Sequence, residues 1–288
     1  MSMNVAKLVT DQFIKILEAG QVDGKWSPCW NRATAMPHNA TTGRAYNGIN
    51  ILLLWAAQMN NGFSSAQWAS YKAWKKAGAQ VRKGEKGQMI VFWKINKKVD
   101  AHGNEETFPM LRYFTVFNAD QVDGWDGVQE PVAAFDRNAE CERIINATGA
   151  QIVHGGGRAC YIPSVDQIHM PKFEDFHTAE HYYSTMFHEL AHWTGAKSRL
   201  NRDLTGRFGD YAYGMEELVA ELTAAFVCAS LGFVSTTRDD HLKYIKGWLE
   251  KIKEDKYAII TAASKADKAM QYILNGAEAQ TEDLAEAA

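Results

Sequence analysis

Two histidines four residues apart, His188 and His192, are the residues of this chain whose types and spacing best support catalytic chemistry. In an α-helix, residues i and i+4 lie one above the other, so both imidazoles can reach one metal ion. Glu189 follows the first histidine and lies beside that point, where it can accept a proton from a metal-activated water molecule. The HExxH pattern therefore predicts a zinc-hydrolase site.

A third protein ligand is expected from the next helical segment, because catalytic zinc takes three protein ligands and keeps one position for water. Residues 215–228 are mainly apolar but include Glu216, Glu217 and Glu221. We predict Glu217 as the third ligand and Glu221, on the same helix face, as the carboxylate that orients a ligating imidazole. Glu216 is expected to point away. The alternative is that these acids form a solvated helix face.

The histidine helix is expected to begin after Thr178, a good N-cap residue, and to end at Gly195. About twenty residues, 195–214, then lead to the acidic helix. A loop of that length is usually functional or disordered. Its arginines and tyrosines either stabilise an oxyanion above the metal or serve as surface charges and packing residues; they are Arg199, Arg202, Arg207, Tyr211 and Tyr213.

Composition limits the class of protein. At 288 residues and 46% hydrophobic, the chain can bury a large core, and its length favours two domains. No apolar run approaches eighteen residues and no charged-then-apolar leader opens the chain, so we expect a cytoplasmic protein that does not enter a membrane. The cysteines lack CxxC spacing, which argues against a disulfide scaffold or a zinc ribbon; they are Cys29, Cys141, Cys160 and Cys228.

Charge divides the chain in two. Residues 1–125 hold 15 Lys and Arg against 9 Asp and Glu, a charge of +6, whereas residues 126–288 hold 16 against 25, a charge of −9. Such asymmetry indicates that the first half meets a polyanion. The change falls in a segment rich in glycine, acids and proline. We therefore predict a domain over residues 1–125, a linker over 126–135 and a second domain over 136–288.

The first half combines its positive charge with seven of the nine tryptophans. Two helices, near residues 4–19 and 48–59, and strands expected at residues 88–94 and 110–117 predict a small α+β domain with an antiparallel sheet. Positive grooves lined with aromatic rings bind single-stranded nucleic acid with little sequence preference. The alternative is that the aromatics are core, which we expect for Trp55, Phe92 and Trp93. The candidate contacts are Arg44, Tyr46, Trp68, Lys72, Arg82, Lys83 and Lys86.

Four segments in this order resemble the ArdC-type antirestriction proteins of conjugative plasmids: residues 37–50, residues 81–87, residues 114–118 with Gln121, and residues 188–195 followed by 216–221. The resemblance runs from about residue 4 to 275. It implies an α+β protein with an N-terminal single-stranded-DNA-binding domain and a zincin-like metallopeptidase domain, mainly helical with a small sheet. It also implies protection of incoming plasmid DNA from host restriction, and it places the metal site at His188, Glu189, His192 and Glu217.

Three function classes remain. The first is an antirestriction protein that binds single-stranded DNA and hydrolyses a peptide bond with one Zn²⁺, or another divalent metal such as Mn²⁺, per chain. The second is a DNA-binding protein with a vestigial metal site, and the third is a regulatory zinc protease recruited to a protein partner. Glu189 favours hydrolysis, because a structural metal site needs no general base. The peptide substrate is not identified by the sequence.

Overall fold

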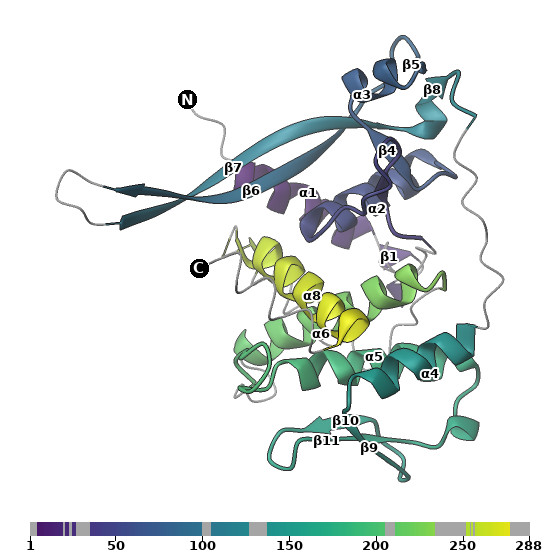
Figure 1. The fold of residues 1–288 in the computed structure, drawn as a ribbon, viewed down its shortest axis with the longest axis vertical. Helices are drawn as coiled ribbons and strands as arrows, with labels where there is room; N and C mark the ends of the chain where they lie inside the picture. The colour runs from purple at the N-terminus through teal and green to yellow at the C-terminus, as the bar shows by residue number, and fades with distance from the viewer. Residues whose placement is uncertain are drawn as a thin grey trace.

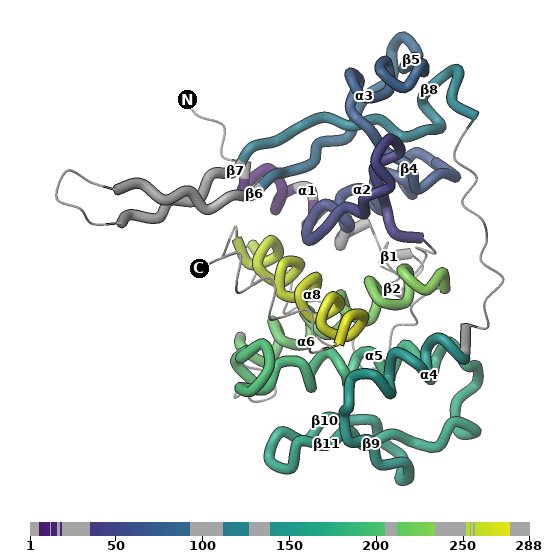
Figure 2. The backbone as a smooth tube through the Cα atoms, in the orientation of Figure 1, coloured from purple at the N-terminus to yellow at the C-terminus, as the bar shows by residue number. Residues whose placement is uncertain are grey.

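The fold is α+β: in the view of Figure 1 a long β-ribbon crosses the upper part of the molecule, packed helices lie below it, and a small sheet lies at the lower end. The computed structural model describes residues 5–19, 21–22, 25–26, 35–99, 105–126, 137–204, 211–233, 252–253, 255 and 257–276, whose course Figure 2 traces in colour except where the tube is grey. The predicted fold class is confirmed. Within these residues, no helix is long and apolar enough to cross a membrane.

The first half is built on a four-stranded sheet of order β3-β4-β7-β6. Its long ribbon pairs β6 (Gln88–Val99) with β7 (Glu105–Asn118), both longer than the sequence predicted. The sheet is mixed rather than antiparallel, because β3 (His38–Asn39) runs parallel to β4 (Gln67–Ala69). Helix α3 (Tyr71–Lys76) follows, capped by the Ser70 side chain, and β5 (Gln80–Val81) pairs with β8 (Val122–Asp123).

Helix α2 (Ile49–Asn61) supports the inner end of this ribbon. Its residues from Ile49 to Ala57 are all buried, as expected for a helix that is apolar on every side. Near its start, the Asn50 amide donates to the Val91 carbonyl and accepts from the Val91 N–H, both at 2.8 Å. A side chain thus takes the place of a further strand at the open edge of β6. Before α2 come α1 (Val5–Ala19) and a short pair, β1 (Gln21–Val22) with β2 (Lys25–Trp26).

The second half packs helices over a small sheet. Helix α4 (Arg137–Ala147) precedes β9 (Gln151–His154), β10 (Cys160–Ile162) and β11 (Gln167–Met170), whose order is β10-β11-β9. Strand β10 is therefore an edge strand, and it lies against α5 (Ala179–Thr194). Helices α6 (Tyr211–Ser230) and α8 (Ala258–Asn275) complete the layer.

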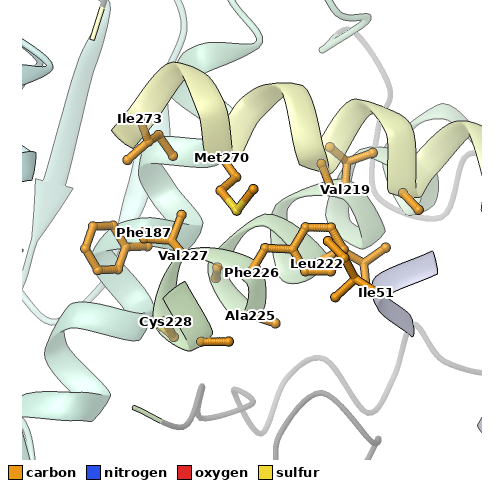
Figure 3. Close-up of a cluster of buried hydrophobic side chains, with 14 of the residues drawn as sticks. Ile51, Phe187, Val219, Leu222, Ala225, Phe226, Val227, Cys228, Met270 and Ile273 are labelled. Atoms are coloured by element: carbon orange, nitrogen blue, oxygen red, sulfur yellow. The ribbon is translucent and has the colours of Figure 1, made fainter. Parts of the chain in front are cut away.

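One hydrophobic core crosses from the first half into the second. The Trp55 ring of α2 meets the Phe226 ring of α6 edge to face, with centroids 5.7 Å apart. Figure 3 shows Ile51 of α2 in the same cluster as Leu222 and Phe226 of α6 and Met270 of α8. The predicted domain boundaries stay a prediction, since residues 127–136, nearly all of the expected linker, lie outside the described residues. Two halves that share a core cannot be separated without exposing it.

Candidate metal centre and nucleic-acid interface

Helix α5 begins and ends where the sequence indicates, although the reason for its end is different. The Thr178 hydroxyl accepts a hydrogen bond from the His181 N–H at 3.2 Å, which confirms the N-cap. Gly195 closes the helix with φ −74°, which any residue can adopt. A Cβ at this position would lie 2.9 Å from both Arg202 Nη2 and Leu204 Cδ2. The glycine is thus needed for space and not for a left-handed turn.

The two histidines of α5 and one glutamate of α6 converge on one point. His188 Nε2 lies 3.1 Å from His192 Nε2. The Glu217 carboxylate lies opposite, 3.5 Å from His188 Nε2 and 3.7 Å from His192 Nε2. His188 and Glu217 are buried, and the His192 side chain is 15% exposed. The packing of α6 on α5 therefore brings together three candidate ligands, of which His192 and Glu217 are 25 residues apart in sequence.

This arrangement fits a divalent metal ion. The three ligand atoms lie within 4.8 Å of one another. Two nitrogen ligands at zinc bond lengths of about 2.0–2.1 Å and tetrahedral angles would lie roughly 3.4 Å apart, close to the 3.1 Å between the imidazole nitrogens. Two imidazoles and a carboxylate form the donor set of many hydrolytic zinc sites, and they also suit other first-row ions.

Electrostatics prepare the carboxylate to bind a cation. Burial opposes ionisation of Glu217, but hydrogen bonds from His188 and Tyr213 and the nearby histidine charges outweigh it, so the pKa of Glu217 falls well below its usual range. Burial also disfavours the charged form of His192 and so lowers its pKa. The Glu216 hydrogen bond and the Glu217 charge act in the opposite direction and raise the pKa of His192 to about 9. A metal at this site must displace the His192 proton, so metal binding weakens as the pH falls.

Glu189 is held from the side of the small sheet. The backbone N–H of Tyr161 on β10 donates to Glu189 Oε2 at 2.9 Å, and Glu189 is buried. The Tyr161 hydroxyl in turn donates to Asp166 at 2.8 Å, and Asp166 pairs with Arg199, whose guanidinium stacks on the Trp193 ring at 3.9 Å. These contacts fasten β10 to the end of α5.

Glu216 contradicts the expectation that it points away. Its Oε1 lies 3.3 Å from His192 Nδ1, and its carboxylate receives Arg202 Nη2 and Nε at 2.8 and 3.0 Å. Arg202 is buried and is no surface charge. Glu221, predicted to orient an imidazole, has Oε2 3.8 Å from His188 Nδ1, beyond hydrogen-bond distance. The sequence signal was present in the adjacent acids Glu216 and Glu217, but their partners come from another helix.

The segment between the two helices that carry the candidate ligands is shorter than the sequence indicated. Helix α6 already begins at Tyr211, so Tyr213 lies one turn before Glu217 and donates a hydrogen bond to it. Arg199 and Arg202 are both held against α5 by hydrogen bonds to its carbonyl groups. Arg207 lies outside the described residues.

One of the predicted nucleic-acid contacts, Trp68, needs correction, and two others, Tyr46 and Arg82, already have partners within the protein. Trp68 is fully buried, so no base can stack on its ring. The Tyr46 ring is half-buried and its hydroxyl donates to the Trp68 carbonyl at 3.3 Å; this burial raises its pKa to about 12. Arg82 is bound to Glu85, to the Asp120 carbonyl and to Asp123, which makes it a support of its own turn. Aromatic and basic residues alternate in the sequence, but in the fold some of these side chains are buried or bonded within the protein and others are exposed.

The other four cations remain exposed: Arg44, Lys72, Lys83 and Lys86. Lys72 lies on α3, and Lys83 and Lys86 lie in the turn between β5 and β6. Figure 1 shows α3, β5 and β8 gathered at one end of the molecule. Within the described part of the chain, no ion pair neutralises these cations.

Two exposed phenylalanines were missed. Phe92, expected in the core, is 50% exposed, and Phe114 is 51% exposed. Phe92 pairs with Arg112 and Ile90 pairs with Phe114, so Phe92, Arg112 and Phe114 share one face of the ribbon. Arg112 is exposed too. Both faces of the ribbon carry aromatics, so the alternation along the strands could not reveal which ones are exposed.

Comparisons with known proteins cover both halves. Residues 3–117 match the family described as the N-terminal domain of anti-restriction factor ArdC, and residues 139–265 match the family described as zincin-like metallopeptidase. The crystal structure of the antirestriction ArdC protein from plasmid R388, in its metal-free form, superposes with a TM-score of 0.80 at 39% identity, over 96% of this chain and 99% of that one. The chain belongs to the ArdC family of antirestriction proteins.

Further ArdC relatives support a divalent metal and a plasmid context. The Mn(II)-bound structure of the R388 protein matches with a TM-score of 0.79 at 39% identity, over 95% of this chain and 98% of that one. The protein y4eC of Sinorhizobium fredii is 43% identical over 92% of this chain and 90% of its own length. An Escherichia coli DNA primase TraC is 36% identical over 92% of this chain, which spans 26% of that longer protein.

Proposed function

We propose that this ArdC-family protein binds single-stranded DNA through its first half and hydrolyses a peptide bond at a divalent metal held by His188, His192 and Glu217, and that it thereby protects incoming plasmid DNA from host restriction in the cytoplasm. The observation that carries the hydrolytic part is the convergence of both imidazole Nε2 atoms and the Glu217 carboxylate around one point. Zn²⁺ is the metal proposed, with Mn²⁺ as the alternative that the R388 structure supports.

Glu189 has the position of a general base. A divalent ion in this site supplies Lewis-acid activation of water. Glu189 follows His188 on α5 and is not one of the three converging ligands, so we assign its carboxylate the role of proton acceptor and not of metal ligand. The Tyr161 N–H donates to Glu189 Oε2 at 2.9 Å, which fixes this buried carboxylate in the position next to a proposed metal ligand. A fixed acceptor of this kind favours hydrolysis over a vestigial metal site.

Metal content tests the ligand set. The full chain is expected to bind one equivalent of Zn²⁺ or Mn²⁺ in dialysed samples measured by mass spectrometry. Replacing His188 or His192 by Ala removes one of three ligands and is expected to abolish stoichiometric binding. His177→Ala is the matched control, because this exposed histidine lies outside the cluster. A double variant His188→Ala and His192→Ala that keeps its metal would show that the site is elsewhere.

The nucleic-acid part rests on exposed cations and rings. Lys83, Lys86 and Arg112 supply positive charge, and Phe92 and Phe114 supply faces on which unstacked bases can lie. Rings of this kind favour single strands, because the bases of a duplex are already stacked on each other. No base-reading motif accompanies them, so the affinity is expected to depend on salt more than on sequence.

Two variants of the full chain test this surface by fluorescence anisotropy with a labelled oligonucleotide. Phe92→Ala with Phe114→Ala is expected to weaken binding at least about tenfold, because base–aromatic stacking contributes about 1–3 kcal/mol per base. Lys83→Glu with Lys86→Glu is expected to weaken binding and to flatten its dependence on salt. Tyr257→Ala, which removes an exposed ring from the second half, is the matched control. Wild-type affinity in both double variants would place the binding site elsewhere.

A further inference from the structure

A buried pair of opposite charges lies directly behind the metal ligand His192. Its Nδ1, on the side of the ring away from the converging Nε2 atoms, lies 3.3 Å from Glu216 Oε1. The same carboxylate receives two nitrogens of Arg202, at 2.8 and 3.0 Å. The side chains of Glu216 and Arg202 are 10% and 4% exposed. The imidazole is therefore placed between the metal site and a charged hydrogen-bond network.

Arg202 is fixed in turn by the last turn of α5. Its Nη1 donates to the Thr194 hydroxyl at 2.9 Å, its Nη2 donates to the Ala191 carbonyl, and its backbone N–H donates to the Gly195 carbonyl at 2.9 Å. A cation is favoured there, because the C-terminal end of a helix carries partial negative charge. The missing side chain at Gly195 leaves the space that the guanidinium occupies.

Stability alone does not account for this pair. Removing two charges from water costs about as much as their attraction returns, and apolar residues of similar size often stabilise such a site equally well. An imidazole can bind a metal through Nε2 only when its proton is on Nδ1. A carboxylate beside Nδ1 selects that tautomer and fixes the plane of the ring.

We propose that Glu216 is a positioning residue for His192 and that Arg202 holds Glu216 in place, so that residues 195–202 are tied to a metal ligand. The proposal rests on the metal site proposed above. Glu216 lies 3.3 Å from His192, whereas Glu221, which the sequence predicts to orient an imidazole, lies 3.8 Å from the other histidine, His188.

Zn²⁺ affinity of the full chain, measured by competition with a chromophoric chelator, tests the proposal. Glu216→Met removes the acceptor but keeps the volume and is expected to weaken binding roughly ten- to hundredfold, the usual effect of losing such a partner. Glu216→Gln keeps an acceptor oxygen without the charge and is expected to fall between Glu216→Met and wild type. Circular dichroism in excess chelator reports whether each metal-free variant is folded.

A double variant separates positioning from folding. Glu216→Met with Arg202→Met removes both charges, so it leaves no uncompensated buried ion, and it is expected to unfold as wild type does in chelator. It is still expected to bind Zn²⁺ as weakly as Glu216→Met does. Wild-type Zn²⁺ affinity in this double variant would overturn the proposal, because the pair would then be structural only.

A matched control lies in the same segment. Arg199→Met breaks another arginine–carboxylate pair, with Asp166, that does not touch His192, and it is expected to retain wild-type Zn²⁺ affinity. Equal weakening in Arg199→Met would overturn the proposal, since the effect would not come from Glu216. Failure of the wild-type chain to bind Zn²⁺ or Mn²⁺ would refute the metal site itself. If His188→Ala loses its metal and Glu216→Met binds Zn²⁺ as tightly as wild type, the positioning role alone is refuted.

Discussion

At the scale of single residues, the proposed chemistry depends on the difference between a carboxylate that would bind the metal and one that would move a proton. Glu217 faces both imidazole Nε2 atoms, whereas Glu189 is held by the Tyr161 N–H beside them. Both residues lie on helices that pack together, and both are buried. Their roles therefore follow from which atoms they face, and they can be separated by substitution.

Glu189→Gln is expected to keep the metal content and the fold of the wild type. Its peptidase activity is expected to fall at least about a hundredfold, the usual contribution of a general base. Plasmid transfer into a restricting host then shows whether proteolysis protects the DNA. We expect protection to depend more on the proposed DNA-binding half, because a protease needs a specific protein substrate, which the sequence does not identify. A Glu189→Gln protein that binds metal and DNA but no longer protects would make proteolysis the mechanism.

Gly195→Ala tests the close packing at the end of α5. Its Cβ would meet the ends of the Arg202 and Leu204 side chains at 2.9 Å and the His192 carbonyl at 3.0 Å, so these side chains must shift and the Arg202 contacts with α5 are disturbed. We expect a destabilisation of about 1–3 kcal/mol in urea unfolding, the usual cost of overpacking. Gly157→Ala is the control, since nothing lies within 4 Å of a Cβ there. An equally small effect at both glycines would contradict this account of Gly195.

At the scale of elements, α2 closes the edge of β6 through one side chain. Asn50→Ala leaves the Val91 N–H and carbonyl without their amide partner in a buried place, and each such group costs about 1–3 kcal/mol. We expect the free energy of unfolding to fall by about 2–4 kcal/mol on this basis. Asn61→Ala, at the exposed end of the same helix, is the control and should change stability by less than about 0.5 kcal/mol.

Helix α8 contacts the start of α2 through Asp267, a carboxyl group whose ionised form is disfavoured by burial. Asp267 accepts a hydrogen bond from the Gly48 backbone, yet burial raises its pKa to about 6 from an ordinary value of 3.8. The folded state therefore favours the protonated form, so the contribution of this group to stability is full below pH 3.8 and is lost as the pH rises through about 6. Asp267→Asn should raise the melting temperature at pH 8 and leave it unchanged near pH 3.5. An equal shift at both pH values would exclude titration of Asp267 as the cause.

At the scale of the whole molecule, the proposed nucleic-acid surface and the candidate metal centre lie in halves joined by one core. Helix α6 carries Glu217 near its start and Phe226 further along, where Phe226 meets Trp55 of α2. Helix α2 in turn holds β6, whose Phe92 belongs to the proposed DNA-binding face. Rigid elements thus connect the two sites.

Trp55→Ala is expected to cost about 3–5 kcal/mol, the usual loss for a large core aromatic, and to lower the stability of both halves together. Urea unfolding followed by circular dichroism and by tryptophan fluorescence should show one transition in each case. Leu8→Ala, at a partly exposed position, is the control. Two transitions of which only one shifts would show that the halves unfold independently.

The sequence by itself determined where the main helices and the β-ribbon lie along the chain. It also determined the part of the metal-site geometry that one helix sets, the placement of the two histidines. Helical periodicity places His188 and His192 on one side whatever surrounds them, and the Thr178 cap follows from local chemistry, whereas the need for glycine at position 195 comes from packing against Arg202 and Leu204. Patterns of apolar residues also located the ribbon and the buried helices, because their periodicity reports which backbone conformation can bury them.

Only the tertiary structure decided which side chains meet across elements. Glu216 and Glu217 are neighbours in sequence, and their different partners depend on how α6 crosses α5 and where Arg202 folds back. Burial of Trp68 and exposure of Phe92 depend in the same way on where α2 covers the ribbon. Composition could show that the first half is basic and aromatic, but exposure is a property of packing between distant segments, which no local pattern contains.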